Sequence, residues 1–251
     1  MTDLALTNFL IRTGDDCLIV GHRLSEWCGH APILEEDVAL ANIALDCIGT
    51  ANALYTRACD LGGGRRTPDE LAFLRSVTEF RNALIVELPR GDFARTIVRQ
   101  YLFAEYELLL FKALSSCPDP EVAGIAGRTI NERKYHVRHC REWVARLGLG
   151  TEESRSRAQA AVDELWPYTA ELFQKDKLLE ELVASGVLPG LDGTSAEWTD
   201  VVSRSLSDAS LVVPADVFQH VGGREGRHTE HLGHLLDEMQ IVARSHPDGK
   251  W

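Results

Sequence analysis

Helix start and stop signals recur along the whole chain, while runs of alternating apolar and polar residues bounded by turns are nearly absent. Residues 34–37 place three acidic side chains where the first turn of a helix meets the positive end of its dipole. Residues 67–70 combine an N-cap threonine, a proline at the first helical position and a capping-box glutamate. These signals predict an all-α fold.

Glycine and proline residues divide the chain into helices of different length. We expect the first five helices over about 7–28, 34–61, 67–82, 92–116 and 118–148. A sixth begins at 151 and extends past Phe173, a shorter one follows to about 185, and the last covers about 224–243. Several are long enough to build a helical bundle. A loop over 186–194 separates this bundle from a C-terminal region. We therefore predict one domain over 1–251, with a core bundle of about 7–174 and accessory helices over about 176–251.

The expected helix 34–61 carries apolar residues on more than one face. A stripe at helical spacing predicts the face that packs into the core: Val38, Ala41, Leu45, Ile48 and Tyr55. Ala39 and Ile43 lie off this stripe. Because one bundle core does not cover both faces, the second face is predicted to be covered by a partner chain or by the C-terminal helices.

Composition excludes some classes of function. The chain has 26 Lys and Arg against 38 Asp and Glu, a formal net charge of −12, so a duplex nucleic acid is not an expected partner. No uninterrupted apolar run approaches the roughly 20 residues that cross a bilayer, so no membrane partner is expected. Asp3 stands where a secretory signal needs positive charge, and we therefore expect a cytoplasmic protein.

The cysteines do not form a known metal or redox spacing. There is no C-x-x-C pair among them, and no histidine pair at zinc-finger spacing follows; they are Cys17, Cys28, Cys47, Cys59, Cys117 and Cys140. The simplest interpretation is buried thiols in a reducing compartment, with a redox or metal role as the alternative.

A bundle of this kind suggests a search for a di-iron centre. Such centres take one Glu from each of two helices and a Glu-x-x-His pair from each of the other two. The spacing matters because residues i and i+3 lie on one helix face and deliver both ligands to one pocket.

Two positions of that ligand set are missing. The first helix offers Glu26 and the second offers Asp46, but Gly49 stands three residues later where a histidine is needed. The fifth helix offers His136, with Arg133 three residues before it where a carboxylate is needed. A cation therefore stands where the ligand set requires an anion.

Positive side chains near these acids suggest a different arrangement. We expect an ion-paired polar core in place of a metal site, built from Glu26, Asp46, Glu105, Glu132, Lys134 and His136. Such clusters persist because stranding one buried partner costs about 3 to 5 kcal/mol. The alternative is that several of these residues face solvent, since Glu132 and Lys134 are two apart and lie on different helix faces.

Two further motifs are weaker. His228, His231 and His234 with Glu230 suggest a zinc site, although hydrogen-bonded packing is the more frequent role of such histidines. The glycine-rich segment 222–226 has the composition of an anion-binding loop, but no strand precedes it, so a hinge is expected.

Several long motifs together carry a family resemblance. They are residues 24–32, 40–46, 91–94, 135–138, 165–173 and 228–233. With them the chain resembles the phenylacetate catabolic family, and within it the structural, non-catalytic subunits of phenylacetyl-CoA epoxidases. The resemblance extends over nearly the whole chain.

The resemblance implies a ferritin-like bundle within a multicomponent monooxygenase that epoxidises the aromatic ring of phenylacetyl-CoA. In that family a catalytic, ferritin-like sister subunit holds the di-iron centre and pairs with the structural subunit, and a reductase supplies electrons from NADPH. Glu26, Asp46 and His136 match carboxylate and histidine positions of the sister, while Gly49 and Arg133 depart from them. The resemblance therefore implies no cofactor, metal or catalytic residue in this chain.

Two functions follow from the sequence. The preferred one is a non-catalytic subunit that stabilises and positions the di-iron catalytic subunit. The alternative is a di-iron oxygenase subunit with its own, incomplete metal site. Gly49 and Arg133 favour the first.

Overall fold

The computed structural model describes residues 2–62, 66–246 and 249, and the regular secondary structure in these ranges is helical, with no strand. The helices are α1 (Thr2–Ser25), α2 (Leu34–Leu61), α3 (Pro68–Phe73), α4 (Leu84–Glu87), α5 (Phe93–Leu114), α6 (Pro120–Gly148), α7 (Glu152–Leu165), α8 (Lys177–Ala184), α9 (Thr194–Asp208) and α10 (Glu230–Ser245). Four short 3₁₀ turns complete them: η1 (Val77–Glu79), η2 (Trp166–Tyr168), η3 (Ala170–Phe173) and η4 (Gly223–Glu225). The predicted all-α fold is confirmed.

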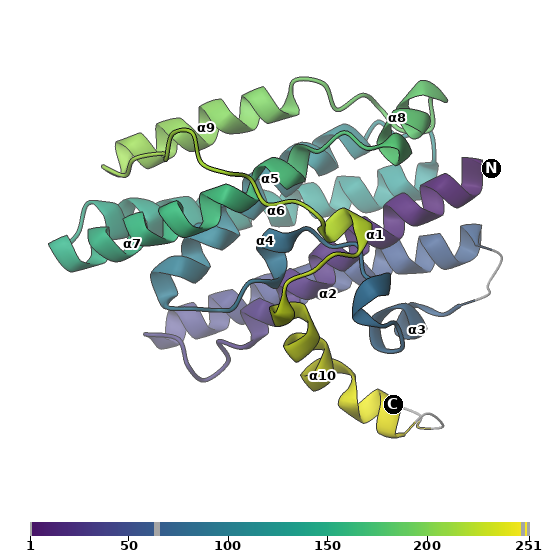
Figure 1. The fold of residues 1–251 in the computed structure, drawn as a ribbon, viewed down its shortest axis with the longest axis horizontal. Coiled ribbons are helices and arrows are strands. Elements are labelled where there is room, and N and C mark those ends of the chain that lie inside the picture. Colours follow the sequence, from purple (N-terminus) through teal and green to yellow (C-terminus); the bar gives the residue numbers. More distant parts are fainter. Residues whose placement is uncertain (1, 63–65, 247–248, 250–251) are drawn as a thin grey trace.

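Four long helices form the centre of the molecule (Figure 1). The helix α1 packs most extensively on α2, and α5 on α6, while α2 also contacts α6. The helices α7 and α9 both pack against α5, and α10 lies against α3, α4 and η1 at the lower edge of Figure 1. The division into a core of about 7–174 and accessory helices of about 176–251 stays a prediction.

Side-chain caps explain where the long helices begin. Asp92 accepts a hydrogen bond from the backbone N–H of Arg95 at the start of α5. Asp119 accepts from the first-turn N–H groups of α6. Thr67 and Glu70 form the predicted capping box of α3. Each cap satisfies donors that have no partner inside the helix, so these starts agree with the local sequence.

The third helix is shorter than predicted, because buried carboxylates accept hydrogen bonds from backbone N–H groups of the residues that follow it. We expected it to run to about residue 82, but α3 ends at Phe73. The backbone N–H groups of Arg81 and Ala83 instead donate to Asp15 and Asp16 of α1. These long-range hydrogen bonds replace the bonds that a continued helix would make.

The boundaries of two later helices also differ from the prediction. The helix α7 ends at Leu165, because Pro167 follows in the first turn of η2, and Phe173 lies in η3. The last helix begins at Glu230 and not near residue 224, because Gly222 and Gly226 have positive φ values that end regular helix here.

The predicted core face of α2 is right at Tyr55, which is buried, but wrong at Val38 and Leu45. Val38 is 53% exposed and Leu45 is 66% exposed, whereas Ala39 and Ile43 are buried. Both faces of α2 carry apolar residues, so periodicity alone does not choose between them. Close packing on α1 decides the outcome.

Two glycines on α1 make that close packing possible. A Cβ atom added at Gly14 would lie 2.6 Å from the Tyr55 ring, and one at Gly21 would lie 2.9 Å from Ile48. Small residues on the facing side of α2, such as Ala44 and Ala51, are buried there. The face that allows the closest approach of the two backbones therefore becomes the inner face.

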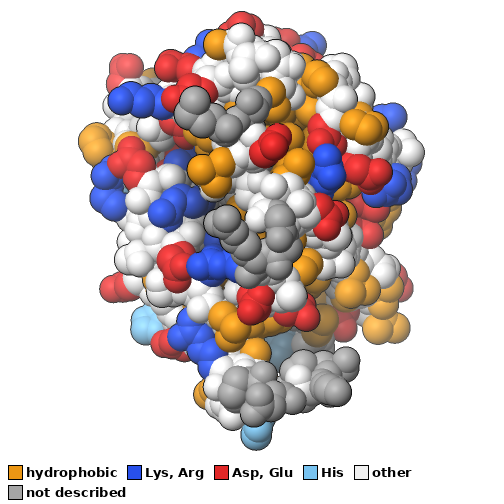
Figure 2. All heavy atoms as spheres, turned by 90° about the vertical axis from the view of Figure 1, so that its right-hand side faces the viewer, with side chains coloured by type: hydrophobic (Ala, Val, Ile, Leu, Met, Phe, Trp, Pro, Cys, Tyr) orange, Lys and Arg blue, Asp and Glu red, His pale blue; other side chains and the backbone are white. Residues whose placement is uncertain are grey.

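One helix, α2, is long and apolar enough to span a membrane by length and composition alone, although it contains no long uninterrupted apolar run. Core helices of soluble proteins also pass this test, and 44% of the apolar window is buried here. The side of the molecule in Figure 2 mixes acidic, basic and hydrophobic side chains. That mixture differs from the basic stripe that a duplex contact needs.

Candidate functional site

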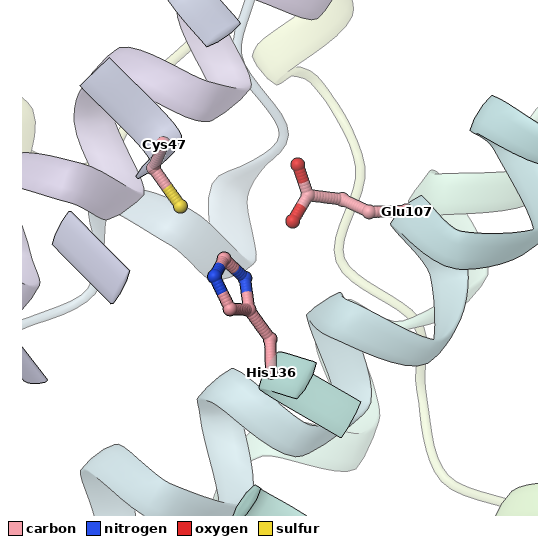
Figure 3. A group of neighbouring side chains, drawn as sticks. All are labelled: Cys47, Glu107 and His136. Carbon is pink, nitrogen blue, oxygen red and sulfur yellow. The ribbon is translucent and has the colours of Figure 1, made fainter. Parts of the chain in front are cut away.

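Six side chains from the four central helices converge in the core. They are Cys17 of α1, Cys47 and Thr50 of α2, Glu107 of α5, and Arg133 and His136 of α6, all of them buried. Two helices thus supply one residue each, and two supply an i, i+3 pair, which is the spacing of a di-iron ligand set. Figure 3 shows Cys47, Glu107 and His136 directed toward one another. We call these six residues the core centre.

A buried ion pair occupies this centre. The Nε atom of Arg133 lies 2.9 Å from Oε2 of Glu107, and the two side chains are 0% and 2% exposed. Burial by itself lowers the pKa of Arg133, but the charge of Glu107 outweighs this and raises that pKa above its usual value. The guanidinium therefore stays charged and offsets the buried carboxylate.

Neutral groups complete the surroundings of the ion pair. Nη2 of Arg133 donates to the Thr50 hydroxyl at 3.3 Å and lies 3.8 Å from Sγ of Cys17. The Cys17 thiol donates to Oε1 of Glu107 at 3.3 Å. The second carboxylate oxygen of Glu107 thus has a donor of its own.

His136 borders the ion pair as a neutral imidazole. Its Nε2 atom lies 3.0 Å from Oδ2 of Asp46, whose side chain is 36% exposed. Burial lowers the pKa of His136 to about 4, and the nearby charge of Arg133 acts in the same direction. Nδ1 of His136 has no hydrogen-bond partner among the described residues.

The six residues do not fit a di-iron centre. Glu107 and His136 are ligand types, and with Cys47 they offer three ligand atoms within 4.8 Å of one another. Burial raises the pKa of Cys47 to about 12, so its thiol is protonated and a poor ligand. Thr50 stands where a histidine is required, and Arg133 stands where a carboxylate is required.

Sequence comparison places the chain among known proteins. The family model described as "Phenylacetic acid catabolic protein" matches residues 1–251. The chain belongs to this phenylacetic acid catabolic family. It is 43% identical over 246 residues to the C subunit of the 1,2-phenylacetyl-CoA epoxidase of Escherichia coli (strain K12), a match that covers 98% of this chain and 99% of the relative. The resemblance noted in the sequence is confirmed.

The structure brings only part of the predicted polar core together. His136 belongs to the core centre, and Asp46 reaches it from the edge. Glu132 lies 3.7 Å from Nη1 of Arg133 with 38% of its side chain exposed. Lys134 is exposed instead of buried, because Arg133, one residue earlier on α6, occupies the inward direction.

The other two predicted carboxylates form separate ion pairs away from the core centre. Glu26, just after α1, pairs with Arg23 at 2.6 Å. Glu105 pairs with Arg141 at 2.5 Å, between α5 and α6. Glu26 and Glu105 are thus ion-paired, but their partners are arginines that do not belong to the predicted cluster.

A shift of one residue on α2 separates the predicted pair from the inward one. Asp46 and Gly49 have the ligand spacing, but Gly49 is exposed and the inward pair is Cys47 and Thr50. Cysteine and threonine are not di-iron ligand types, so a comparison by ligand type does not find them. The spacing of three between two polar positions is the signal in the sequence that could have found this pair.

The two weaker motifs have structural roles. The His228 ring nitrogens lie 2.7 Å from Oε2 of Glu87 and 3.0 Å from the Phe80 carbonyl oxygen, as hydrogen-bonded packing predicts. The backbone N–H groups of Gly222 and Gly223 both donate to Oε1 of Glu171 at 2.7 Å. The glycine-rich segment therefore binds a carboxylate of the chain itself, and its role as a hinge stays a prediction.

Proposed function

We propose that this chain is the non-catalytic, structural subunit of a multicomponent phenylacetyl-CoA epoxidase. The observation that carries the proposal is the Arg133 guanidinium, paired with Glu107 at 2.9 Å inside the four-helix core. It supplies from the chain itself the positive charge that a metal ion supplies in a di-iron bundle. The 43% identical relative is the C subunit of such an epoxidase, which supports membership of the same kind of complex.

The partners follow from this role. The chain would pair with a ferritin-like, di-iron catalytic subunit in the cytoplasm, and a reductase component would bring electrons from NADPH to that partner. An apolar strip exposed on α2, with Leu34 73% and Leu45 66% exposed, supports an interface with another chain. Stable interfaces of this kind commonly bury more than about 2,000 Å².

Iron binding tests the non-catalytic role. The purified chain, loaded anaerobically with Fe²⁺ and desalted, is expected to retain no stoichiometric iron, because Arg133 and Thr50 replace two ligands. A ferritin-like di-iron protein taken through the same procedure is the positive control. Two retained irons per chain would contradict the proposal.

Assembly tests the structural role. Co-expression with the di-iron subunit from the same organism, followed by size-exclusion chromatography with light scattering, is expected to give an equimolar complex. A charged substitution on the exposed strip, Leu45→Glu, should weaken the complex, whereas Ser156→Glu, which adds the same single negative charge at an exposed position of α7, is the control. Separate elution of the two parent chains at micromolar concentration would contradict the proposal.

One observation favours the alternative, a metal site in this chain. Cys47, Glu107 and His136 present three ligand atoms within 4.8 Å of one another. A metal held there would have to displace Arg133 from Glu107. Retention of one metal ion per chain, lost in the Cys47→Ser variant, would support this second function.

A further inference from the structure

A cavity lies apart from the core centre, between the bundle and the C-terminal segment. It has a volume of about 380 Å³. Its walls come from α1, α5, η3, α8 and the start of α9, which lies with α8 along the upper edge of Figure 1. Pockets that hold small ligands begin at about 300 Å³, so a small organic molecule fits by size.

One part of this cavity is apolar. Leu109, Leu110, Leu172 and Phe173 line it, and the Phe173 ring meets the Tyr106 ring edge to face at 5.5 Å. Such walls accept a hydrocarbon chain or ring and offer it no hydrogen bonds.

The other part is lined by two arginines, Arg12 and Arg224. Their side chains are only 9% and 7% exposed. Burial lowers the pKa of Arg12, and the nearby positive charge of Arg224 lowers it further. Both guanidinium groups line the same hollow and each is already paired with one carboxylate, Arg12 with Asp176 and Arg224 with Asp16, so a bound anion would be a second acceptor for both.

Donor atoms remain free at these arginines. Within the described residues, Arg12 donates only through Nη1, to Asp176 at 2.5 Å, which leaves Nε and Nη2. Arg224 donates through Nη1 and Nη2 to Asp16 and the Arg81 carbonyl, which leaves Nε. The Tyr106 hydroxyl also has no partner among the described residues, and burial raises the pKa of Tyr106 to about 12, so it stays a donor.

Nearby acids occupy only part of this donor surface: Asp176 pairs with Arg12 and Asp16 with Arg224, which leaves the N–H groups named above. Glu171 lines the cavity, but its two oxygens accept the backbone N–H groups of Leu84, Gly222 and Gly223. The start of α9 also lines the cavity, and its N-cap residue Gly193 provides no side-chain cap. Its open N–H groups add to the positive potential.

We infer that this cavity binds a small amphipathic carboxylate, with its hydrocarbon part against Leu110 and Phe173 and its carboxylate between Arg12 and Arg224. The apolar wall and the paired guanidinium groups meet in one hollow, which suits a molecule with an acidic head and an apolar body. A guanidinium fork matches a carboxylate in geometry as well as in charge. Such a ligand would contact both the bundle and the C-terminal segment and would stabilise their packing.

Isothermal titration calorimetry of the full chain with octanoate tests this inference. Octanoate is expected to bind, its neutral isostere octanamide to bind at least about tenfold more weakly, and inorganic phosphate not to bind, because it lacks an apolar part. Equal binding of octanoate and octanamide, phosphate binding without octanoate binding, or no octanoate binding would overturn the inference.

Two variants on one helix locate the binding site. Ala196→Trp places a large side chain at an exposed position that lines the cavity, and should weaken octanoate binding at least about tenfold without loss of helicity. Ser207→Trp, at an exposed position near the other end of α9, is the matched control and should bind like the parent. Unchanged binding by Ala196→Trp would overturn the assignment. Because the titration needs neither partner nor iron, its failure leaves the proposed function untouched.

Discussion

The core centre and a second buried ionic cluster stabilise this protein in different ways. We call the second cluster the α1 clamp; it consists of Asp15 and Asp16 of α1 with Arg75 and Arg224 from later parts of the chain. In the core centre, Arg133 and Glu107 pair across two regular helices. In the clamp, Asp15 pairs with Arg75, which follows α3, and Asp16 pairs with Arg224 of η4 at 2.8 Å, so both partners lie outside the α-helices.

The difference lies in what the carboxylates do for the backbone. Helices satisfy the backbone groups around the core centre, so its ion pair balances only side-chain charge. Asp15 accepts the backbone N–H of Arg81 at 2.8 Å, and Asp16 accepts that of Ala83 at 2.7 Å. A buried ion pair can therefore be exchanged for apolar groups in the core centre, but not in the clamp, where backbone donors would lose their partners.

The largest effect is expected from Asp16→Ala. This change strands the Arg224 guanidinium and the backbone N–H of Ala83 in the interior. We expect a loss of about 5 kcal/mol in the free energy of unfolding, measured in urea. The control is Asp192→Ala, which removes an exposed partner of Lys175. It should change the free energy of unfolding by less than about 0.5 kcal/mol. A loss below about 1 kcal/mol for Asp16→Ala would contradict the importance of the clamp.

Double substitutions sharpen the comparison. Arg133→Met alone should cost about 4 kcal/mol, because it strands Glu107, while Arg133→Met with Glu107→Leu should return to within about 1 kcal/mol of the parent. Asp16→Leu with Arg224→Met should stay destabilised by about 2 kcal/mol, because the Ala83 N–H remains unpaired. Equal recovery in both double variants, measured in urea, would remove the distinction between the two clusters.

The pH dependence of stability should reveal His136 in the core centre. Burial lowers the pKa of His136 from 6.5 to about 4, so the unfolded chain takes up a proton first as the pH falls. This histidine therefore favours the native state above pH 6.5, and the benefit is lost between pH 6.5 and about 4, by on the order of 3 kcal/mol. His136→Gln should lack that loss in urea titrations at several pH values, whereas the exposed His30→Gln should retain it.

His228, which lies near the clamp, should show the opposite sign and the smallest effect. Burial lowers the pKa of His228, but its hydrogen bond to Glu87 and the charge of Glu87 outweigh burial and raise it overall. The native state then holds the proton more tightly than the unfolded chain does. His228 therefore stabilises the native state fully below pH 6.5, and this stabilisation is lost as the pH rises through the raised pKa. His228→Gln should therefore destabilise the protein more at pH 6 than at pH 9, and the reverse order would contradict this assignment.

The core centre was only partly predictable, for a physical reason. The sequence alone showed that Arg133 replaces a carboxylate of the di-iron ligand set, because this depends only on residue type and a spacing of three within one helix. On α5 we predicted Glu105, whereas the acid that pairs with Arg133 is Glu107, two residues later. Helical periodicity describes which residues share a face, but it does not say which face another helix will cover.

The amino-acid sequence by itself determined the helical class, most helix starts and the family, because caps, proline positions and long motifs act locally along the chain. Only the tertiary structure decided that Val38 and Leu45 of α2 face outward and that α3 stops at Phe73. Both outcomes depend on partners far away in sequence: the glycines of α1 that admit the small face of α2, and the buried aspartates that bind backbone N–H groups of residues 81 and 83. Local propensity is weak compared with the cost of an unpaired buried donor or a steric clash, so the long-range contact determines the conformation.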